Sequence, residues 1–356
     1  ARLTYYRTGG ISTYIVRLIE ALERLDFEHP YVVFHSRKAR EALVPRFRRA
    51  DLWTPCHHRL ERLALSVELA RFGLDLLHSP DFIPPLRGAR RHVITVHDLN
   101  FLFYPQYLTA DSLRYYNGQI AAAVKQADHI FADSEATKRD LITLLHVPAE
   151  QITVHLLGVD EQFQPQPPAE ITRVRAALNL PPEYLLYVGT FEPRKNIAGL
   201  IEAYAQLPAD GPPLVLAGNR GWLFEETMQQ IERLKLGERV LWREKIPQAD
   251  LPGLYSGASL LLTPSFYEGF GLPALEAMAC GTIPIVSNRG SLPEVVGEVG
   301  LQVNPDDTAD IAGAISRALS DQTWREQQRQ AGFRRAATFQ WETTARIVLS
   351  VYKALL

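Results

Sequence analysis

Residues 259–287 read SLLLTPSFYEGFGLPALEAMACGTIPIVS, and this stretch decides the fold. The apolar run Ser259–Thr263 is typical of a buried strand, and a loop with two glycines follows it. Pro273–Ala279 then carries a helical pattern, with proline at an expected first position and Gly281 as the expected C-cap. A β-branched run, Ile283–Ser287, predicts the next strand. Strand, helix and strand in this order are typical of a parallel sheet covered by helices.

The same alternation runs along the whole chain of 356 residues, which is too long for one ordinary core. The other strands are predicted at Tyr31–Phe34, Leu76–His78, His92–His97, His129–Ala132, Ile152–His155, Leu185–Val188, Leu214–Ala217 and Arg239–Trp242. The other helices are predicted at Ser12–Arg24, Ser112–Gln126, Ser134–Leu145, Ile197–Gln206, Phe224–Leu234, Ala249–Ser256, Ala309–Ser320 and Trp341–Leu356.

A proline-rich stretch, Gln164-Pro-Gln-Pro-Pro168, interrupts the alternation and predicts a linker. We therefore expect an α/β chain of two Rossmann-like domains, residues 1–165 and 166–338, and a separate C-terminal helix over residues 339–356. The two parallel sheets should face a central cleft, with ligands at the carboxyl ends of the strands.

Composition and charge exclude several classes of protein. Lys and Arg number 38 against 40 Asp and Glu, so no net positive field attracts nucleic acid. The two cysteines, Cys56 and Cys280, form no metal or disulfide pattern, and no apolar run reaches the roughly 20 residues that span a bilayer. We expect a cytoplasmic protein. Arginines cluster in the first hundred residues; a solvated surface explains them best, and a peripheral contact with the inner face of a membrane stays open.

The loop and helix within residues 265–281 predict an anion site. Its glycines allow close approach of a ligand to the backbone, and the helix start adds the positive end of its dipole. Glu268 should lie in the loop and Glu276 in the first helical turn, where a carboxylate suits vicinal hydroxyls of a sugar or ribose. Taken singly, each glutamate is better explained by dipole complementation, but the whole run favours a ligand site.

Two further segments follow predicted strands. Gly189-Thr-Phe-Glu-Pro-Arg194-Lys195-Asn196 ends in two cations that are poorly placed for the following helix dipole and well placed to hold a diphosphate. His97-Asp98 ends another strand and suits general base catalysis or metal ligation, although such a pair is more often structural. No second His or Cys stands at metal-ligand spacing, so we expect no metal.

Gly9-Gly10 forms a turn before the helix at Ser12, where the backbone can pass close to a ligand. Such a turn normally follows a buried strand. The first residues supply none, and we expect the chain to be trimmed there.

Together these motifs resemble the retaining GT-B glycosyltransferases of family 4, also called group 1. Glu268 and Glu276, with seven residues between them, are similar to the E-x7-E motif of that family. The segment from Gly189 to Asn196 resembles its donor-phosphate motif. The resemblance covers nearly the whole chain and is strongest over residues 184–305.

The resemblance implies a role for each matching residue. Arg194 and Lys195 would grip the donor diphosphate, and Glu268 and His97 would lie at the transferred sugar. Glu276 would bind the ribose. Backbone groups near the sugar and phosphates would come from Gly10, Gly189, Phe270, Gly271 and Leu272. The C-terminal helix would pack back on the first domain.

The expected reaction is metal-independent hexosyl transfer, of mannose or glucose type, with retention and without a cofactor. The donor would be a nucleotide-diphosphate sugar, and the acceptor a sugar or lipid-linked hydroxyl. The segment Leu241–Ile246 departs from the family pattern near the base, so GDP-mannose and UDP-glucose both stay open. A phosphorylase, an epimerase and a catalytically inactive sugar-binding scaffold are the alternatives. An oxidoreductase is disfavoured because the chain has no GxGxxG fingerprint with a following acidic residue.

Overall fold

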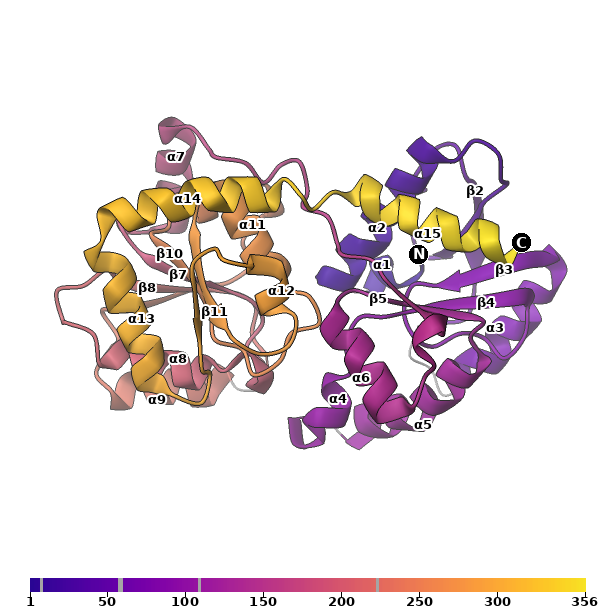
Figure 1. Cartoon of the computed structure of the whole chain (residues 1–356), viewed down its shortest axis with the longest axis horizontal. Coiled ribbons are helices and arrows are strands. Elements are labelled where there is room, and N and C mark those ends of the chain that lie inside the picture. Colours follow the sequence, from indigo (N-terminus) through magenta and orange to yellow (C-terminus); the bar gives the residue numbers. More distant parts are fainter. Residues whose placement is uncertain (7–8, 57–59, 108–109, 222–223) are drawn as a thin grey trace. The chain divides into compact units, whose positions relative to one another are not determined.

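The computed structural model describes residues 1–6, 9–56, 60–107, 110–221 and 224–356. They form two compact units, Val159–Phe339 and Ala1–Gly158 together with Gln340–Leu356 (Figure 1). Each unit is an α/β structure in which all strand pairs are parallel. The prediction of two Rossmann-like domains with parallel sheets is thereby confirmed. The central cleft stays a prediction.

The first unit carries a two-stranded sheet, β1-β2, and a four-stranded sheet in the order β3-β4-β5-β6. The strands are β1 (Val32–Ser36), β2 (Arg48–Leu52), β3 (Leu74–Ser79), β4 (Ala89–Val96), β5 (His129–Ala132) and β6 (Ile152–Val154). The helices are α1 (Leu3–Tyr6), α2 (Gly10–Leu25), α3 (Glu61–Leu69), α4 (Asn100–Phe103), α5 (Ala110–Gln126), α6 (Glu135–Leu145) and α15 (Trp341–Leu355).

The second unit has one six-stranded sheet in the order β12-β11-β10-β7-β8-β9. The strands are β7 (Leu185–Val188), β8 (Leu214–Ala217), β9 (Val240–Arg243), β10 (Leu260–Thr263), β11 (Ile283–Ser287) and β12 (Leu301–Val303). The helices are α7 (Pro168–Leu178), α8 (Ile197–Ala205), α9 (Phe224–Arg233), α10 (Leu251–Ser256), α11 (Leu272–Cys280), α12 (Leu292–Val296), α13 (Thr308–Ser320) and α14 (Gln322–Ala336).

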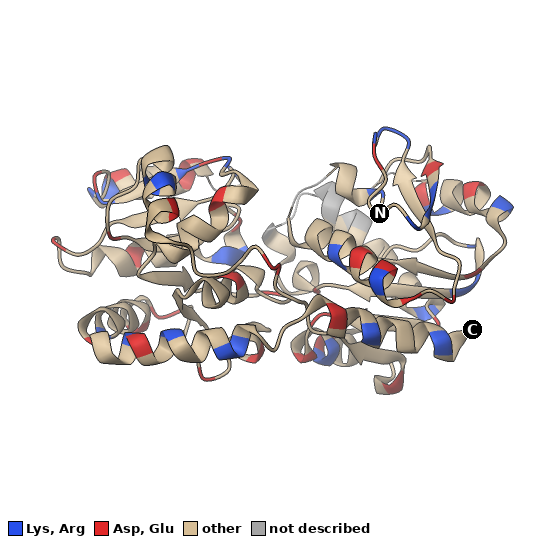
Figure 2. Cartoon of the chain, turned by 90° about the horizontal axis from the view of Figure 1, so that it is seen from above, with Lys and Arg blue, Asp and Glu red and all other residues tan. Residues whose placement is uncertain are grey.

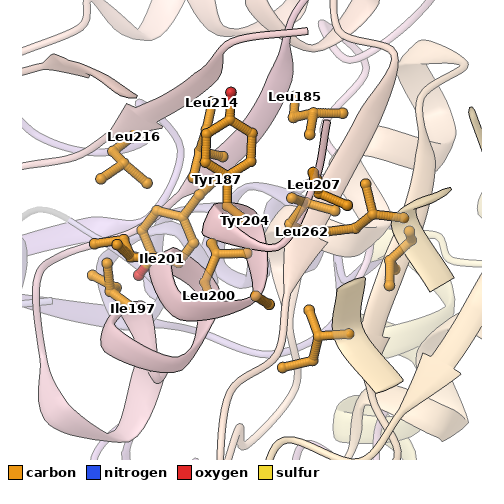
Figure 3. Packing of buried hydrophobic residues seen from close by; sticks show 14 of the residues in the cluster. Leu185, Tyr187, Ile197, Leu200, Ile201, Tyr204, Leu207, Leu214, Leu216 and Leu262 are labelled. Atoms are coloured by element: carbon orange, nitrogen blue, oxygen red, sulfur yellow. The ribbon is translucent and has the colours of Figure 1, made fainter. Parts of the chain in front are cut away.

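Strand alternation builds the core of the second unit. Leu185 and Tyr187 of β7 and Leu214 and Leu216 of β8 lie on one face of the sheet, against Leu200 of α8 (Figure 3). All five side chains are fully buried, and α9 and α13 add residues to the same cluster. A parallel sheet covered on both faces needs such continuously apolar strands. The apolar runs in the sequence therefore predicted these strands.

The C-terminal helix belongs to the first unit, where α15 packs against α2 (Figure 1). A Cβ atom placed on Gly158 would lie 2.2 Å from the backbone nitrogen of Trp341. The chain leaves the first unit after Gly158 and returns to it at Gln340, and these two segments can lie in contact only because residue 158 has no side chain. The prediction that this helix packs back on the first domain is confirmed.

Two expectations are corrected, and one strand was not predicted. The predicted linker ends at once, because Pro168 is the first residue of α7, a position that suits proline. No strand was predicted around Arg48, where β2 is a short charged strand at the edge of its sheet; Arg48 is exposed, as expected for a solvated cluster. Finally, α11 begins at Leu272, so its first turn holds no acidic residue and Glu276 lies in the second turn.

Candidate active site

The sheet of the second unit has one point where the strand order reverses. The chain places β8 and β9 on one side of β7 and then returns to place β10 on the other side. Open parallel sheets bind ligands at the carboxyl ends of the strands that flank such a switch point. The loops after β7 and β10 are therefore the expected binding site.

Hydrogen bonds hold these two loops together. The Phe266 amide donates to the Arg194 carbonyl oxygen over 2.8 Å. Buried Asn196 donates from Nδ2 to the carbonyl oxygens of Pro264 and Pro305, over 3.0 and 2.7 Å. Its backbone has a φ of 57°, a left-handed conformation that asparagine tolerates well. The predicted phosphate motif thus has a rigid backbone before any ligand binds.

The loops bring Arg194, Lys195 and Glu268 together. Lys195 Nζ lies 2.6 and 2.8 Å from the two carboxylate oxygens of Glu268, and an Arg194 guanidinium nitrogen lies 2.9 Å from Oε2. Ser265 Oγ donates to Oε1 over 2.8 Å. The side chains of Arg194, Lys195 and Glu268 are only 20%, 13% and 7% exposed. The structure thus assembles the two cations and the first glutamate of the motif into one buried cluster.

This cluster combines two positive charges with one buried carboxylate. Burial acts to raise the pKa of Glu268, but the adjacent ammonium and guanidinium groups outweigh it and lower that pKa to about 2. Burial and Arg194 lower the pKa of Lys195, while Glu268 opposes them. A second acidic side chain, Glu192, accepts from Arg194 Nε over 2.9 Å but is 35% exposed. Two cations thus face two carboxylates in the free site, and Arg194 and Lys195 can pair with an anionic ligand in place of these carboxylates.

The start of α11 lies at the carboxyl end of β10. Gly271 precedes it with a φ of 103°, and a Cβ atom there would lie 2.5 Å from Leu292. Phe270 and Leu272 flank this glycine, and Ser291 donates to the carbonyl oxygens of Glu268 and Phe270 over 2.9 and 2.7 Å. Pro273 has no N–H, and the Ala274 amide already donates to the Gly271 carbonyl oxygen over 3.0 Å, so the amides of Gly271 and Leu272 are the ones that this turn can offer to an anion.

Glu276 occupies a different environment from Glu268. The Tyr255 hydroxyl of α10 donates to its Oε2 over 2.8 Å. Burial raises the pKa of Glu276 to about 7; the bond from Tyr255 lowers it, and the charge of Asp160 adds to the increase. The two glutamates of the E-x7-E motif therefore differ in charge at neutral pH: Glu268 is ionised, and Glu276 is close to half protonated.

His97 lies in the first unit, at the carboxyl end of β4. Its Nδ1 is 2.7 Å from Oδ2 of Asp133, and its Nε2 is 3.0 Å from the carbonyl oxygen of Pro80. Burial lowers the pKa of His97, but the charge and hydrogen bond of Asp133 raise it more, and the net value is about 9. The neighbouring Asp98 carboxylate accepts from Asn100, so the acidic partner of His97 is Asp133.

Gly10 and Gly189 lie in different units and at different kinds of turn. Gly10 opens α2 after Gly9, which has a φ of 128°. Gly189 follows β7, and a Cβ atom on the neighbouring Gly218 would lie 1.8 Å from its carbonyl oxygen. Gly10 and His97 belong to the first unit and the remaining predicted site residues to the second. That all of them act on one ligand stays a prediction.

Sequence reasoning missed the partners of the motif residues. Ser265, Tyr255 and Asp133 each contact a predicted site residue directly. Asp133 was open to prediction, because it follows the predicted strand His129–Ala132 and so lies at the same sheet edge as His97. The contact between Tyr255 and Glu276 has no local signal in the sequence.

Within the described ranges, the side-chain groups that meet metal-ligand spacing are Asp26, Glu28 and His29. Oδ1 of Asp26 already accepts hydrogen bonds from the amides of Glu28 and His29, and Oδ2 from the hydroxyl of Tyr31. This cluster follows α2 and contains none of the predicted site residues.

Among the described helices, none combines the length and the apolar character that a membrane crossing requires.

Two family models match the chain. The model described as Glycosyltransferase Family 4 matches residues 8–163, and the model described as Glycosyl transferases group 1 matches residues 169–335. The two matches fall on the two predicted domains.

Individual proteins are similar over most of this chain. The O-antigen chain mannosyltransferase B of Escherichia coli is 38% identical over 284 residues, which are 79% of this chain and 74% of that protein. The serotype-specific mannosyltransferase WbdA of Escherichia coli is 32% identical over 74% of this chain. The matched region is only 33% of the length of WbdA. The solved structure of sucrose-phosphate synthase from Thermosynechococcus elongatus matches with a TM-score of 0.81 and 27% identity, over 98% of this chain and 94% of that one.

Proposed function

This chain belongs to the family 4 (group 1) glycosyltransferases, and we propose that it transfers a hexose from a nucleoside diphosphate sugar with retention and without a metal ion. The observation that carries this proposal is the cluster of Arg194, Lys195 and Glu268 at the switch point of the second sheet. It combines two cations with a carboxylate at the place where a parallel sheet binds its ligand.

Arg194, Lys195 and the backbone amides of Gly271 and Leu272 at the start of α11 would hold the diphosphate. When the bond between the sugar C1 and the diphosphate oxygen breaks, negative charge develops on that oxygen, and preorganised cations stabilise it. The new bond from C1 to the acceptor oxygen forms on the same face. The acceptor hydroxyl passes its proton to the departing diphosphate, so the atoms and charges balance without an enzymic base.

Glu268 would release Lys195 and Arg194 to the phosphates and accept hydrogen bonds from hydroxyls of the transferred sugar. Its low pKa supports this role, because an ionised carboxylate accepts two hydroxyl hydrogen bonds side by side. Glu276 would hold the ribose diol from the second turn of α11. The two glutamates would therefore bind two different sugar rings of one donor, Glu268 the transferred hexose and Glu276 the ribose.

Mannose is the favoured sugar, because the relatives with 38% and 32% identity are named mannosyltransferases. The name O-antigen chain mannosyltransferase favours a growing glycan, free or lipid-linked, as acceptor. A cytoplasmic site at the inner face of a membrane would fit such an acceptor. Glucose is the second candidate, because sucrose-phosphate synthase is similar over nearly the whole chain.

A transfer assay tests the proposal. The chain is incubated with GDP-mannose or UDP-glucose and a mannose oligosaccharide, with EDTA or with manganese, and the product is analysed by NMR for its anomeric configuration. We expect release of one nucleoside diphosphate, an α-linked product and no loss with EDTA. An inverted product would refute retention, and activity only with manganese would refute metal independence. Binding of a nucleoside diphosphate without any transfer would favour the inactive scaffold.

A further inference from the structure

The environment of His97 defines its protonation state. Both ring nitrogens face oxygen atoms that only accept hydrogen bonds, Nδ1 the Asp133 carboxylate and Nε2 the Pro80 carbonyl oxygen. A neutral imidazole has one N–H donor, so it can satisfy one of these acceptors, whereas an imidazolium satisfies both. The geometry therefore favours the charged ring and leaves no nitrogen lone pair to take a proton.

The chain holds this pair in place from several sides. Ala132 pairs with Val96 across β5 and β4, so residues 133 and 97 leave the sheet next to each other. Thr137 Oγ1 donates to the His97 carbonyl oxygen over 3.3 Å. The side chains of His97 and Asp133 are 13% and 4% exposed. Little freedom is left to either partner.

Among the described residues, the titratable groups around the pair add no competing positive charge. Asp81, after β3, contributes a further negative charge to His97. Tyr14 of α2 lies edge-on at 5.0 Å between ring centroids. Burial lowers the pKa of His155, after β6, and lowers that of His78 in β3 to about 3, so both rings are neutral.

Asp133 also has a site for a second partner. Its Oδ1 lies 3.8 Å from Nδ1 of His155, and neither atom has a hydrogen-bond partner among the described residues. Nε2 of His155 is 3.0 Å from the Tyr14 hydroxyl. The carboxylate is thus committed to His97 through one oxygen, with a neutral histidine beside the other.

We propose that Asp133 is a positioning residue of the transfer site, which holds His97 as a fixed imidazolium so that His97 acts on the donor through its positive charge and not as a proton acceptor. The proposal rests on the proposed function for the reaction that it serves. The cation would complement the negative charge that develops on the leaving diphosphate, and Asp133 itself would touch neither substrate.

The substitution Asp133→Asn tests this role, because it keeps the shape of the side chain and removes its charge. We expect NMR of ring-labelled histidine to show wild-type His97 doubly protonated up to a pH of about 9. In the variant, the titration should move down toward the ordinary value of about 6.5, since the charge of Asp81 and the hydrogen bond to Pro80 are then left to oppose burial. Transfer by the variant should fall on the order of tenfold or more at neutral pH and recover toward pH of about 5.5.

Asp128→Asn is the matched control. Asp128 precedes β5 as Asp133 follows it, and its carboxylate accepts from Arg91 and the His92 amide. Its loss should leave the titration of His97 and the pH profile of transfer unchanged.

Two results would overturn the proposal: a wild-type His97 that titrates near the ordinary value of about 6.5, or an Asp133→Asn profile parallel to that of wild type. If the variant does not fold, the wild-type titration still decides between the charged and the neutral ring. If no donor supports transfer, the proposed function fails, while the NMR result still decides whether Asp133 holds His97 as a cation.

Discussion

Lys195 is the residue on which charge stabilisation depends most directly. Its ammonium group makes two short contacts with Glu268, and its side chain is less exposed than that of Arg194. We expect Lys195→Ala to lower kcat with a loss on the order of 2–4 kcal/mol in transition-state stabilisation. Steady-state kinetics measure this effect, and thermal unfolding checks that the variant folds.

Arg233→Ala is the control for Lys195→Ala, because Arg233 is an exposed cation at the end of α9 in the same unit. It should keep full activity. Turnover of Lys195→Ala within a factor of about two of wild type would mean that the buried cluster has a structural role only.

Glu276 is expected to serve recognition more than chemistry. Its carboxylate lies on the second turn of α11, beyond the helix start that would hold the phosphates. Loss of a paired hydrogen bond to a buried diol costs roughly 1–3 kcal/mol in binding. Glu276→Gln should therefore raise the donor KM more than it lowers kcat, and it should bind a 2′,3′-dideoxy nucleotide about as well as wild type does. A variant with normal donor affinity and lost turnover would place Glu276 in the chemistry.

The titration of Glu276 also predicts a stability profile. Burial raises its folded-state pKa from 4.5 to about 7, so between these values the folded chain holds a proton that the unfolded chain has lost. The contribution of this group to stability is therefore full below pH of about 4.5 and is lost as pH rises toward about 7. Urea unfolding at pH 5 and 7 should show wild type losing more stability than Glu276→Gln. An equal change in both would mean that Glu276 is ionised throughout.

At the scale of elements, the docking of α15 depends on one close contact. A methyl group at residue 158 would meet the Trp341 backbone nitrogen at 2.2 Å, and backbone atoms cannot yield as a flexible side chain does. We expect Gly158→Ala to destabilise the chain by about 1–3 kcal/mol and to loosen the contact of α15 with α2. Thermal unfolding and hydrogen exchange of residues 341–355 measure the two effects.

Gly313→Ala serves as the comparison for Gly158→Ala. Gly313 lies on the exposed face of α13, where an added Cβ meets nothing within 4 Å. Alanine stabilises a helix interior by up to about 1 kcal/mol relative to glycine, so this variant should melt at the same temperature or higher. If both variants melted like wild type, the path of the chain at residue 158 would tolerate a side chain.

For the whole molecule, charge is distributed without a dominant sign. Lys and Arg alternate with Asp and Glu along several helices in the view of Figure 2, in keeping with a net charge of −2. The two cations of the candidate site, Arg194 and Lys195, lie together at the carboxyl edge of the second sheet. A small anion is therefore a better ligand for this chain than a polyanion.

A nucleoside diphosphate should stabilise this edge without a divalent metal. A ligand at 100 times its Kd adds about 2.7 kcal/mol to the stability of the native state. With EDTA present, we expect GDP or UDP to raise the melting temperature and to protect residues 189–196 and 264–272 from hydrogen exchange. The unphosphorylated nucleoside should do so far less. Stabilisation that required manganese would contradict a site built from protein cations.

Local patterns determined most of the fold. The apolar run Leu260–Leu262 of β10 and the caps of α11 each involve residues that are close in sequence. Hydrophobic periodicity and turn-forming residues can therefore be recognised in the sequence alone. The motif residues at the second sheet were found for the same reason, because each follows a predicted strand. The charged strand β2 was missed, since an edge strand does not need an apolar sequence.

Tertiary structure alone decided the partners and the charge states. Glu268 and Glu276 are the same residue type, yet neighbouring cations lower the pKa of the first to about 2 and burial raises that of the second to about 7. His97 is followed in sequence by Asp98 but pairs with Asp133, which the neighbouring strand brings to it. Desolvation and Coulomb interactions depend on distance in space, and residues far apart in the sequence supply them.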